Sequence, residues 1–272
     1  MRLSLALVIV SLSISTAFGQ PAKEQSVGWV LYFAQTDSRQ GMQEITNAIR
    51  AVSEIPALLD AEKRMLSLDG SIGQVELAEW VFNELDQPAG AQFLTKPNAT
   101  PNRYSYQLPT GSADTAAVFS FASAPSPAHI QETVNTIRAL AELVRLMPVN
   151  ERRLIVLRGE PARVAFAEWL FHQLDQPANA QPGALPASPQ EYRLPPGIDR
   201  DHNDLSRVYY LAHAVNAKDR MQIVNTIRAA TKITRLMPIS EPSAIVLRAN
   251  DQQAADADQV IRQLDQPAAP VN

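Results

Sequence analysis

The tetrapeptide Leu-Asp-Gln-Pro decides the fold, because it occurs three times, at Leu85–Pro88, Leu174–Pro177 and Leu264–Pro267. Successive aspartates lie 89 and 90 residues apart (175 − 86 and 265 − 175). Proline disfavours helical backbone in the residue before it, so each copy is typical of a helix that ends at its aspartate or glutamine. We interpret the aspartates as parts of a helix stop and not as catalytic groups. The fixed period predicts one structural unit present in three tandem copies.

Two further motifs recur at the same period. Asn-x-Ile-Arg-Ala is found at residues 47–51, 135–139 and 225–229, and Arg-Leu-Met-Pro at 145–148 and 235–238. Residues 132–177 and 222–267 align without a gap and share 22 identities in 46 positions. The first copy is the most diverged and lacks Arg-Leu-Met-Pro. Agreement of this kind indicates duplication of one ancestral unit.

Each copy has the same order of predicted elements. β-branched and aromatic runs at residues 29–33, 118–121 and 208–211 predict a first strand. A helix with an apolar stripe follows, and then a weak strand interrupted by Pro148 or Pro238, which we expect at a sheet edge. An apolar run at 154–157 or 244–247 predicts a buried strand, and a second helix closes the copy. The predicted fold is α+β: three β-α-β-β-α modules, each with two helices on one face of a small mixed sheet.

These elements set the predicted domain boundaries. We expect module 1 (diverged) at residues 28–88, module 2 at 104–177 and module 3 at 191–267. Linkers are expected at 89–103 and 178–190, and a tail at 268–272. Tyr-x-Leu-Pro, at 106–109 and again at 192–195, predicts an added edge strand that opens the second and third modules.

The N-terminus predicts export. Arg2 precedes an apolar run from Leu3 to about Ile14, and small residues up to Gly19 follow. This pattern is typical of a secretory signal peptide at residues 1–19, cleaved near Gly19. The run is shorter than a membrane-spanning helix requires, although an uncleaved N-terminal anchor stays open. We expect a periplasmic or secreted mature chain without a membrane span.

Composition removes several kinds of chemistry. The 272 residues include no cysteine, which excludes disulfides, thiolate zinc sites and a cysteine nucleophile. The net charge of −4, from 24 basic and 28 acidic residues, argues against nucleic acid as a partner. The four histidines show no metal-binding spacing, and no nucleophile or phosphate-binding motif is present. We therefore expect no enzyme activity, no catalytic residue, no metal and no cofactor.

Five residues are candidates for an interface. Arg50, Arg138 and Arg228 each follow the repeated asparagine by three positions and share one helical face. Either they form ordinary solvated surface or they join modules. Trp80 and Trp169 occupy equivalent positions in the second helix, and each either covers its module's core or anchors an interface.

Together these motifs resemble the short N-terminal repeats of bacterial secretins. The similarity rests on Asn-Thr-Ile-Arg in the first helix, the Ile-Val-Leu strand and the closing Leu-Asp-Gln-Pro, and it covers roughly 180 residues of the chain. Secretin repeats usually carry an asparagine before the Ile-Val strand, where this chain has Arg152-Arg153 and Pro242-Ser243. The chain ends at Asn272, so we expect it to lack the pore-forming domain of that family.

The resemblance implies modules that form periplasmic rings and dock partners without chemistry. We expect an exported, non-enzymatic scaffold that binds an envelope protein, for example a secretin or related assembly, beside a secretion or pilus system. Homo-oligomerisation is left open. The alternative is a periplasmic peptide- or glycan-binding module that uses a sheet edge or a groove. A hydrolase would need acid–base groups gathered from different copies.

Overall fold

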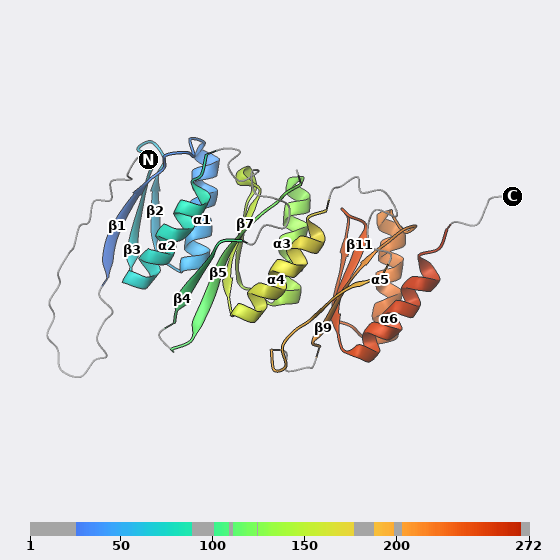
Figure 1. Ribbon diagram of the computed structural model, residues 1–272. Helices are drawn as coiled ribbons and strands as arrows, with labels where there is room; N and C mark the ends of the chain where they lie inside the picture. Colours follow the sequence, from blue (N-terminus) through green and yellow to red (C-terminus); the bar gives the residue numbers. More distant parts are fainter. Residues whose placement is uncertain are drawn as a thin grey trace. The chain divides into compact units, whose positions relative to one another are not determined.

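The computed structural model describes residues 26–88, 101–108, 111–123, 125–176, 188–198 and 203–267. The signal peptide predicted for residues 1–19, the predicted tail and most of both predicted linkers lie outside the described residues. Within the described ranges the fold is mixed α+β, with six α-helices and three small sheets (Figure 1).

The order of elements follows the sequence motifs. The first repeat has β1 (Val27–Tyr32), α1 (Arg39–Ser53), β2 (Ala57–Asp60), β3 (Met65–Gly70) and α2 (Ile72–Leu85). The second has β4 (Arg103–Gln107), β5 (Ala113–Ser120), α3 (Pro127–Ala141), β6 (Arg145–Val149), the short 3₁₀ helix η2 (Asn150–Arg152), β7 (Leu154–Gly159) and α4 (Pro161–Leu174). The third has β8 (Gln190–Arg193), β9 (Leu205–Tyr210), α5 (Ala217–Thr231), β10 (Arg235–Ile239), β11 (Ala244–Ala249) and α6 (Asp251–Leu264).

All strand pairs in the three sheets are antiparallel, so the prediction of mixed sheets is wrong. The strand orders are β1-β3-β2, β4-β5-β7-β6 and β10-β11-β9-β8. The β-α-β start of each repeat makes two strands parallel, but the third strand inserts between them and pairs antiparallel with both. The proline-containing strands β6 and β10 lie at sheet edges, as expected of strands that lack a ladder donor. The added strands β4 and β8 lie at the opposite edges.

Polar caps explain where several helices begin. Ser38 precedes α1 and its hydroxyl accepts a hydrogen bond from the Gly41 amide at 2.8 Å. Asn250 precedes α6 and forms a reciprocal pair with Gln253: the Gln253 backbone N–H donates to Asn250 Oδ1 at 2.9 Å, and the Asn250 backbone N–H donates to Gln253 Oε1 at 3.3 Å. Such side-chain acceptors satisfy amides that have no partner inside the helix.

The chain forms two compact units, and their boundary falls inside the second repeat. One unit is Met1–Ala122 with Val144–Glu160, and the other is Ser123–Leu143 with Pro161–Asn272. The second repeat therefore contributes its sheet to the first unit and its two helices to the second unit. The three predicted module boundaries stay a prediction.

The first unit is a helical layer between two sheets. Helices α1 and α2 lie against the sheet of β1, β3 and β2 (Figure 1), and they also contact the strands of the second repeat. On α1, Met42, Ile45, Ile49 and Val52 recur at three- and four-residue steps and are buried. Their core continues into Val118 and Val156 on the second sheet, and all six residues of β7 are buried. We infer that the second sheet completes the burial of the first pair of helices.

The second unit has helices on both sides of its sheet. Helices α5 and α6 pack on β9, β10 and β11, and α3 and α4 contact β10, β11 and β8. Ile223, Val224 and Ile227 of α5 share one core with Ile245 and Leu247 of β11. All six residues of β11 are buried, as expected of a strand covered on both faces.

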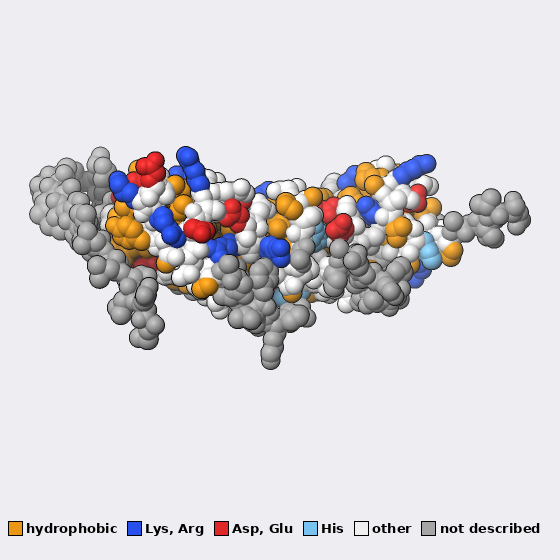
Figure 2. All heavy atoms as spheres, turned by 90° about the horizontal axis from the view of Figure 1, so that it is seen from above, with side chains coloured by type: hydrophobic (Ala, Val, Ile, Leu, Met, Phe, Trp, Pro, Cys, Tyr) orange, Lys and Arg blue, Asp and Glu red, His pale blue; other side chains and the backbone are white. Residues whose placement is uncertain are grey.

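Surface charges are mixed in sign. On the face drawn in Figure 2, basic and acidic side chains of the described residues are interspersed with apolar ones, and no extended patch of one sign is visible there. No helix of the described part is both long enough and apolar enough to cross a bilayer.

Candidate functional site: the faces that join successive repeats

The C-terminal end of α1 carries an ion-pair cluster. Glu54 follows the helix in left-handed backbone, with φ of 54°. Its carboxylate lies 2.8 Å from the Arg145 guanidinium and 2.6 Å from that of Arg158, both on the sheet of the second repeat. The Arg158 side chain is 1% exposed and also lies 3.2 Å from Asp114. A buried guanidinium requires such partners, because an unpaired buried charge costs several kcal/mol.

Burial alone would raise the pKa of Glu54, but hydrogen bonds from Arg145 and Arg158 and their charges outweigh it. The pKa of this carboxyl therefore lies below its ordinary value, and the carboxylate stays ionised at neutral pH.

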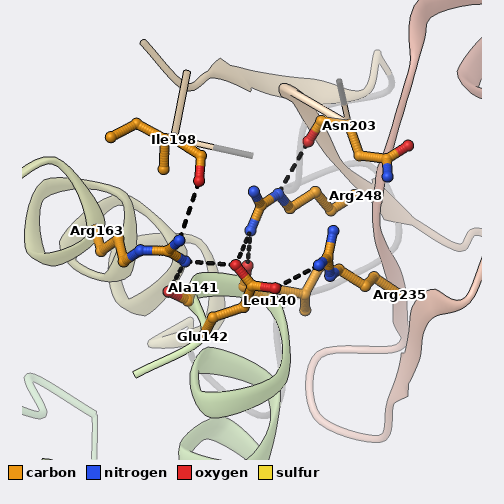
Figure 3. Close-up of polar contacts among 8 residues, drawn as sticks. All are labelled: Leu140, Ala141, Glu142, Arg163, Ile198, Asn203, Arg235 and Arg248. Atoms are coloured by element: carbon orange, nitrogen blue, oxygen red, sulfur yellow. Dashed lines mark hydrogen bonds and ion pairs between the residues drawn. The ribbon is translucent and has the colours of Figure 1, made fainter. Parts of the chain in front are cut away.

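The second unit repeats this cluster at the end of α3. Glu142 again has left-handed backbone, with φ of 55°. Its carboxylate contacts Arg235 and lies 3.4 Å from Arg248, both on the sheet of the third repeat (Figure 3). Arg163 of α4 lies 2.5 Å from the same carboxylate. Burial would raise the pKa of Glu142, but the Arg163 hydrogen bond and the charges of Arg235, Arg248 and Arg163 lower it.

Arg248 holds the end of α3 by its backbone as well. Its guanidinium donates to the Leu140 carbonyl at 2.6 Å and to the Asn203 carbonyl at 2.9 Å (Figure 3). The side chain has no exposed surface, so these carbonyls and Glu142 take the place of its hydration.

Strand register brings the two arginines of each cluster together. Arg145 and Arg158 are direct cross-strand partners on β6 and β7, and Arg235 and Arg248 are partners on β10 and β11. Directly opposed residues lie on the same face of a sheet. None of these four arginines is among the interface candidates predicted from the sequence, although all four are among the identities shared by the second and third copies.

A second carboxylate contact accompanies each cluster. Glu44 of α1 accepts a hydrogen bond from the Glu151 amide at 3.1 Å. Glu132 of α3 accepts one from the Ser240 amide at 2.9 Å and one from the Ser240 hydroxyl at 3.1 Å. In both cases a glutamate of the first helix binds the turn between two strands of the following sheet. The two faces therefore carry the same pair of acidic anchors.

The tryptophans contact the added edge strands. The ring centroids of Trp80 and Tyr104 are 5.6 Å apart, and those of Trp169 and Tyr192 are 5.4 Å apart. Tyr104 pairs with Ala116 and Tyr192 with Ser206, which occupy equivalent places in their sheets. Tyr104, and not Tyr106 of the Tyr-x-Leu-Pro motif, is thus the counterpart of Tyr192. We infer that each tryptophan packs a helix against the next strand along the chain.

The candidate arginines bind within their own repeats. Arg50 is exposed, and its guanidinium donates to the Ala57 carbonyl on β2 at 2.9 Å. Arg228 is exposed and donates to the Leu236 carbonyl on β10 at 3.0 Å. Arg138 is also exposed. In the first and third repeats this arginine ties the first helix to the following edge strand.

The aspartates of Leu-Asp-Gln-Pro do more than mark a helix end. The Asp86 carboxylate accepts hydrogen bonds from the amides of residues 34, 35 and 36 at 2.7, 3.2 and 2.7 Å. Asp265 accepts from the amides of residues 212, 213 and 214, each at 2.8 Å. Asp175 accepts from the Ser123 amide at 3.2 Å and its hydroxyl at 2.6 Å. The carboxylate thus binds a backbone nest after the first strand and closes the repeat on itself.

The described residues were also considered as ligands for a metal ion. Across the described ranges no group of three or more histidine, cysteine, aspartate or glutamate side chains could hold a metal ion. The absence of a cofactor and of enzyme activity stays an expectation from the sequence.

Of the comparisons with known proteins, only the one with solved structures gives matches, and the matches described below are secretins. No family model matches the chain, and no curated protein matches it. The chain is similar to ExeD of Aeromonas hydrophila, with 14% identity over 89% of this chain and 42% of that chain, and a TM-score of 0.20. It is similar to the AspS–GspD pilotin–secretin complex of ETEC, with 15% identity over 90% and 38% of the two chains and a TM-score of 0.20.

A shorter structure is also similar: the N-terminal domain of the secretin XcpQ from Pseudomonas aeruginosa. Identity is 14% over 83% of this chain and 95% of that chain, with a TM-score of 0.26. The chain spans less than half the length of ExeD and of the ETEC complex chain it matches. At these TM-scores the likenesses carry no weight in assigning a function, which has to rest on the residues themselves.

Proposed function

We propose that the protein is an exported, non-enzymatic scaffold whose repeats mediate protein–protein assembly in the cell envelope, beside a secretion or pilus system. The observation that carries the proposal is the face described above. Twice, a glutamate that ends the first helix binds a cross-strand pair of arginines on the following sheet. A sheet of this fold is therefore built to receive a helical face.

The physical properties of these faces suit binding and not catalysis. Their charged groups are paired with one another, and the lowered pKa values of Glu54 and Glu142 hold those carboxylates ionised at neutral pH. A general acid or base needs a pKa near the working pH. The sequence resemblance to secretin repeats and the predicted signal peptide support the proposed envelope location and the proposed kind of partner.

The test is chemical cross-linking in the native host. The full-length chain carries a C-terminal tag, cells are treated with a membrane-permeable cross-linker, and captured proteins are identified by mass spectrometry. The control is L7R, which interrupts the predicted apolar run of the signal peptide and blocks export. We expect envelope proteins to be captured by the parent chain and lost with L7R.

Two results would contradict the proposal. Equal capture by the parent chain and by L7R would show that export plays no part in binding. Retention of the purified chain on peptidoglycan, with no protein captured in cells, would instead favour the glycan-binding alternative.

A further inference from the structure

The helical face of the third repeat differs in charge from those of the first two. We call the face formed by the first and second helices of a repeat its outgoing face. Its acidic anchor after the helix lies seven residues beyond the repeated asparagine, at Glu54 and at Glu142. The same position in the third repeat is Lys232, which is exposed and has the same left-handed backbone, with φ of 58°. The other acidic anchor, three residues before the asparagine, is replaced by Gln222.

The sheet face of the first repeat carries an acidic residue where the sheet faces of the other two repeats carry an arginine. We call the face of a sheet that carries the arginine pair its receiving face. Arg158 and Arg248 each lie 17 residues before the aspartate of Leu-Asp-Gln-Pro (175 − 158 and 265 − 248). The residue 17 positions before Asp86 is Asp69, on β3. Asp69 is exposed and accepts a hydrogen bond from the Ser26 hydroxyl.

The two terminal faces therefore carry the reverse of the internal charge pair. Inside the chain, a glutamate on the outgoing face meets an arginine on the receiving face. At the ends, Lys232 stands in the glutamate's place and Asp69 in the arginine's. A lysine facing the buried arginine of an internal sheet would be repelled, whereas facing Asp69 it is attracted. Among the faces of this chain, the charges favour the pairing of one terminal face with the other.

At one aligned position each, the two terminal faces carry a polar side chain where the internal faces carry an apolar one. Trp80 and Trp169, which pack on the following strand, correspond to the exposed Gln259 in the third repeat. On the first sheet, Ser67 takes the place of the buried valine of β7, Val156. The receiving face of the first repeat also keeps exposed apolar side chains: Leu58, the cross-strand partner of Ser67, is 73% exposed, and Tyr32 on the same face is 52% exposed. A contact on this face would therefore combine an ion pair with burial of apolar surface.

We propose that the outgoing face of the third repeat docks on the receiving face of the first repeat in a second copy of this chain, with Lys232 opposite Asp69. The contact is heterologous, so copies join head to tail, and they form an open chain or a closed ring according to the rotation between them. This inference deepens the proposed scaffold function and names a partner for it.

The absence of cysteine allows a specific test on the full chain. Q222C places a thiol on the outgoing face, and E62C places one on the turn between β2 and β3, the counterpart of the turn that Glu132 binds. Lys232 and Asp69 are left in place. The two single-cysteine proteins are incubated separately and mixed, with a short bis-maleimide. We expect a cross-linked dimer in the mixture and little in either protein alone.

Charge variants then test the ion pair. K232E in the Q222C protein, or D69K in the E62C protein, should lower the mixed product about fivefold, and mixing both variants should restore it. About 1 M salt should lower the unmodified yield as well. No mixed product, equal product from the single proteins, or indifference to both charge variants would overturn the inference. Capture of an envelope protein in cells without any mixed dimer would overturn this inference and leave the proposed function standing.

Discussion

Glu142→Gln tests the energetics of the joining face most directly. The substitution keeps the size of the side chain but removes the charge that three arginines share. A charge-assisted hydrogen bond contributes about 1.5–3 kcal/mol. The Glu142 side chain is 34% exposed, which screens the interaction, and Arg248 keeps its two carbonyl partners. We expect the free energy of unfolding of the second unit to fall by about 2 kcal/mol at neutral pH.

The destabilisation should depend on pH with a definite sign. The pKa of Glu142 is lower in the folded protein than its ordinary value of 4.5. A carboxyl with a lowered folded pKa stabilises the fold at pH values above its unfolded pKa, and this stabilisation is lost as the pH falls through the folded pKa. The difference in unfolding free energy between wild type and E142Q should therefore have its full value above about pH 5.5 and decrease as the pH falls below that.

The assay is urea unfolding followed by tryptophan fluorescence, with hydrogen exchange to localise the change, because two units need not unfold together. E62Q, at an exposed glutamate outside both clusters, is the control and should leave stability within error. An E142Q variant no less stable than E62Q would refute the reasoning. So would a stability difference that stays constant from neutral pH to pH 3.

Three further variants follow from the same contacts. Asp265→Asn places an amide group against backbone donors, and we expect a loss of about 2 kcal/mol in unfolding free energy and faster hydrogen exchange at residues 212–214. Trp169→Ala removes the ring that packs against Tyr192 and should lower stability by about 3 kcal/mol, read from the urea midpoint; a midpoint unchanged within error would count against the packing role. Arg228→Met keeps the aliphatic part of the side chain but removes the hydrogen-bond donor. We expect the free energy of unfolding, measured by thermal unfolding, to fall by about 1 kcal/mol. Arg50→Met removes the equivalent contact and should have a similar effect.

Local sequence signals predicted the elements of this fold well. The proline after each helix, the apolar stripe of the first helix and the broken strand at Pro148 all act on the backbone within a few residues. The sheet type required more: the strand that follows the second strand through a short turn inserts between the first and second strands. Its antiparallel pairing with the first strand spans an intervening helix, which no local pattern reports. The prediction of mixed sheets failed for that reason.

The joining faces were the hardest part to foresee. Arg145 and Arg158 become neighbours only through strand register, and Glu54 reaches them from the preceding repeat. Within one copy, the two arginines and the glutamate look like ordinary surface charges. A comparison of the three aligned copies could have indicated the joining faces. One aligned position holds a glutamate in the first two copies, Glu54 and Glu142, and a lysine in the third, Lys232.

The clasp made by each Leu-Asp-Gln-Pro aspartate has a consequence for synthesis of the chain. The loop after the first strand finds its anion about 50 residues later, at the last turn of the same repeat. While a ribosome is still making α6, the amides at 212–214 have no carboxylate to bind. A nascent repeat thus matures in a single late step, and a chain cut just short of residue 265 should fray at β9 as well as at its new end.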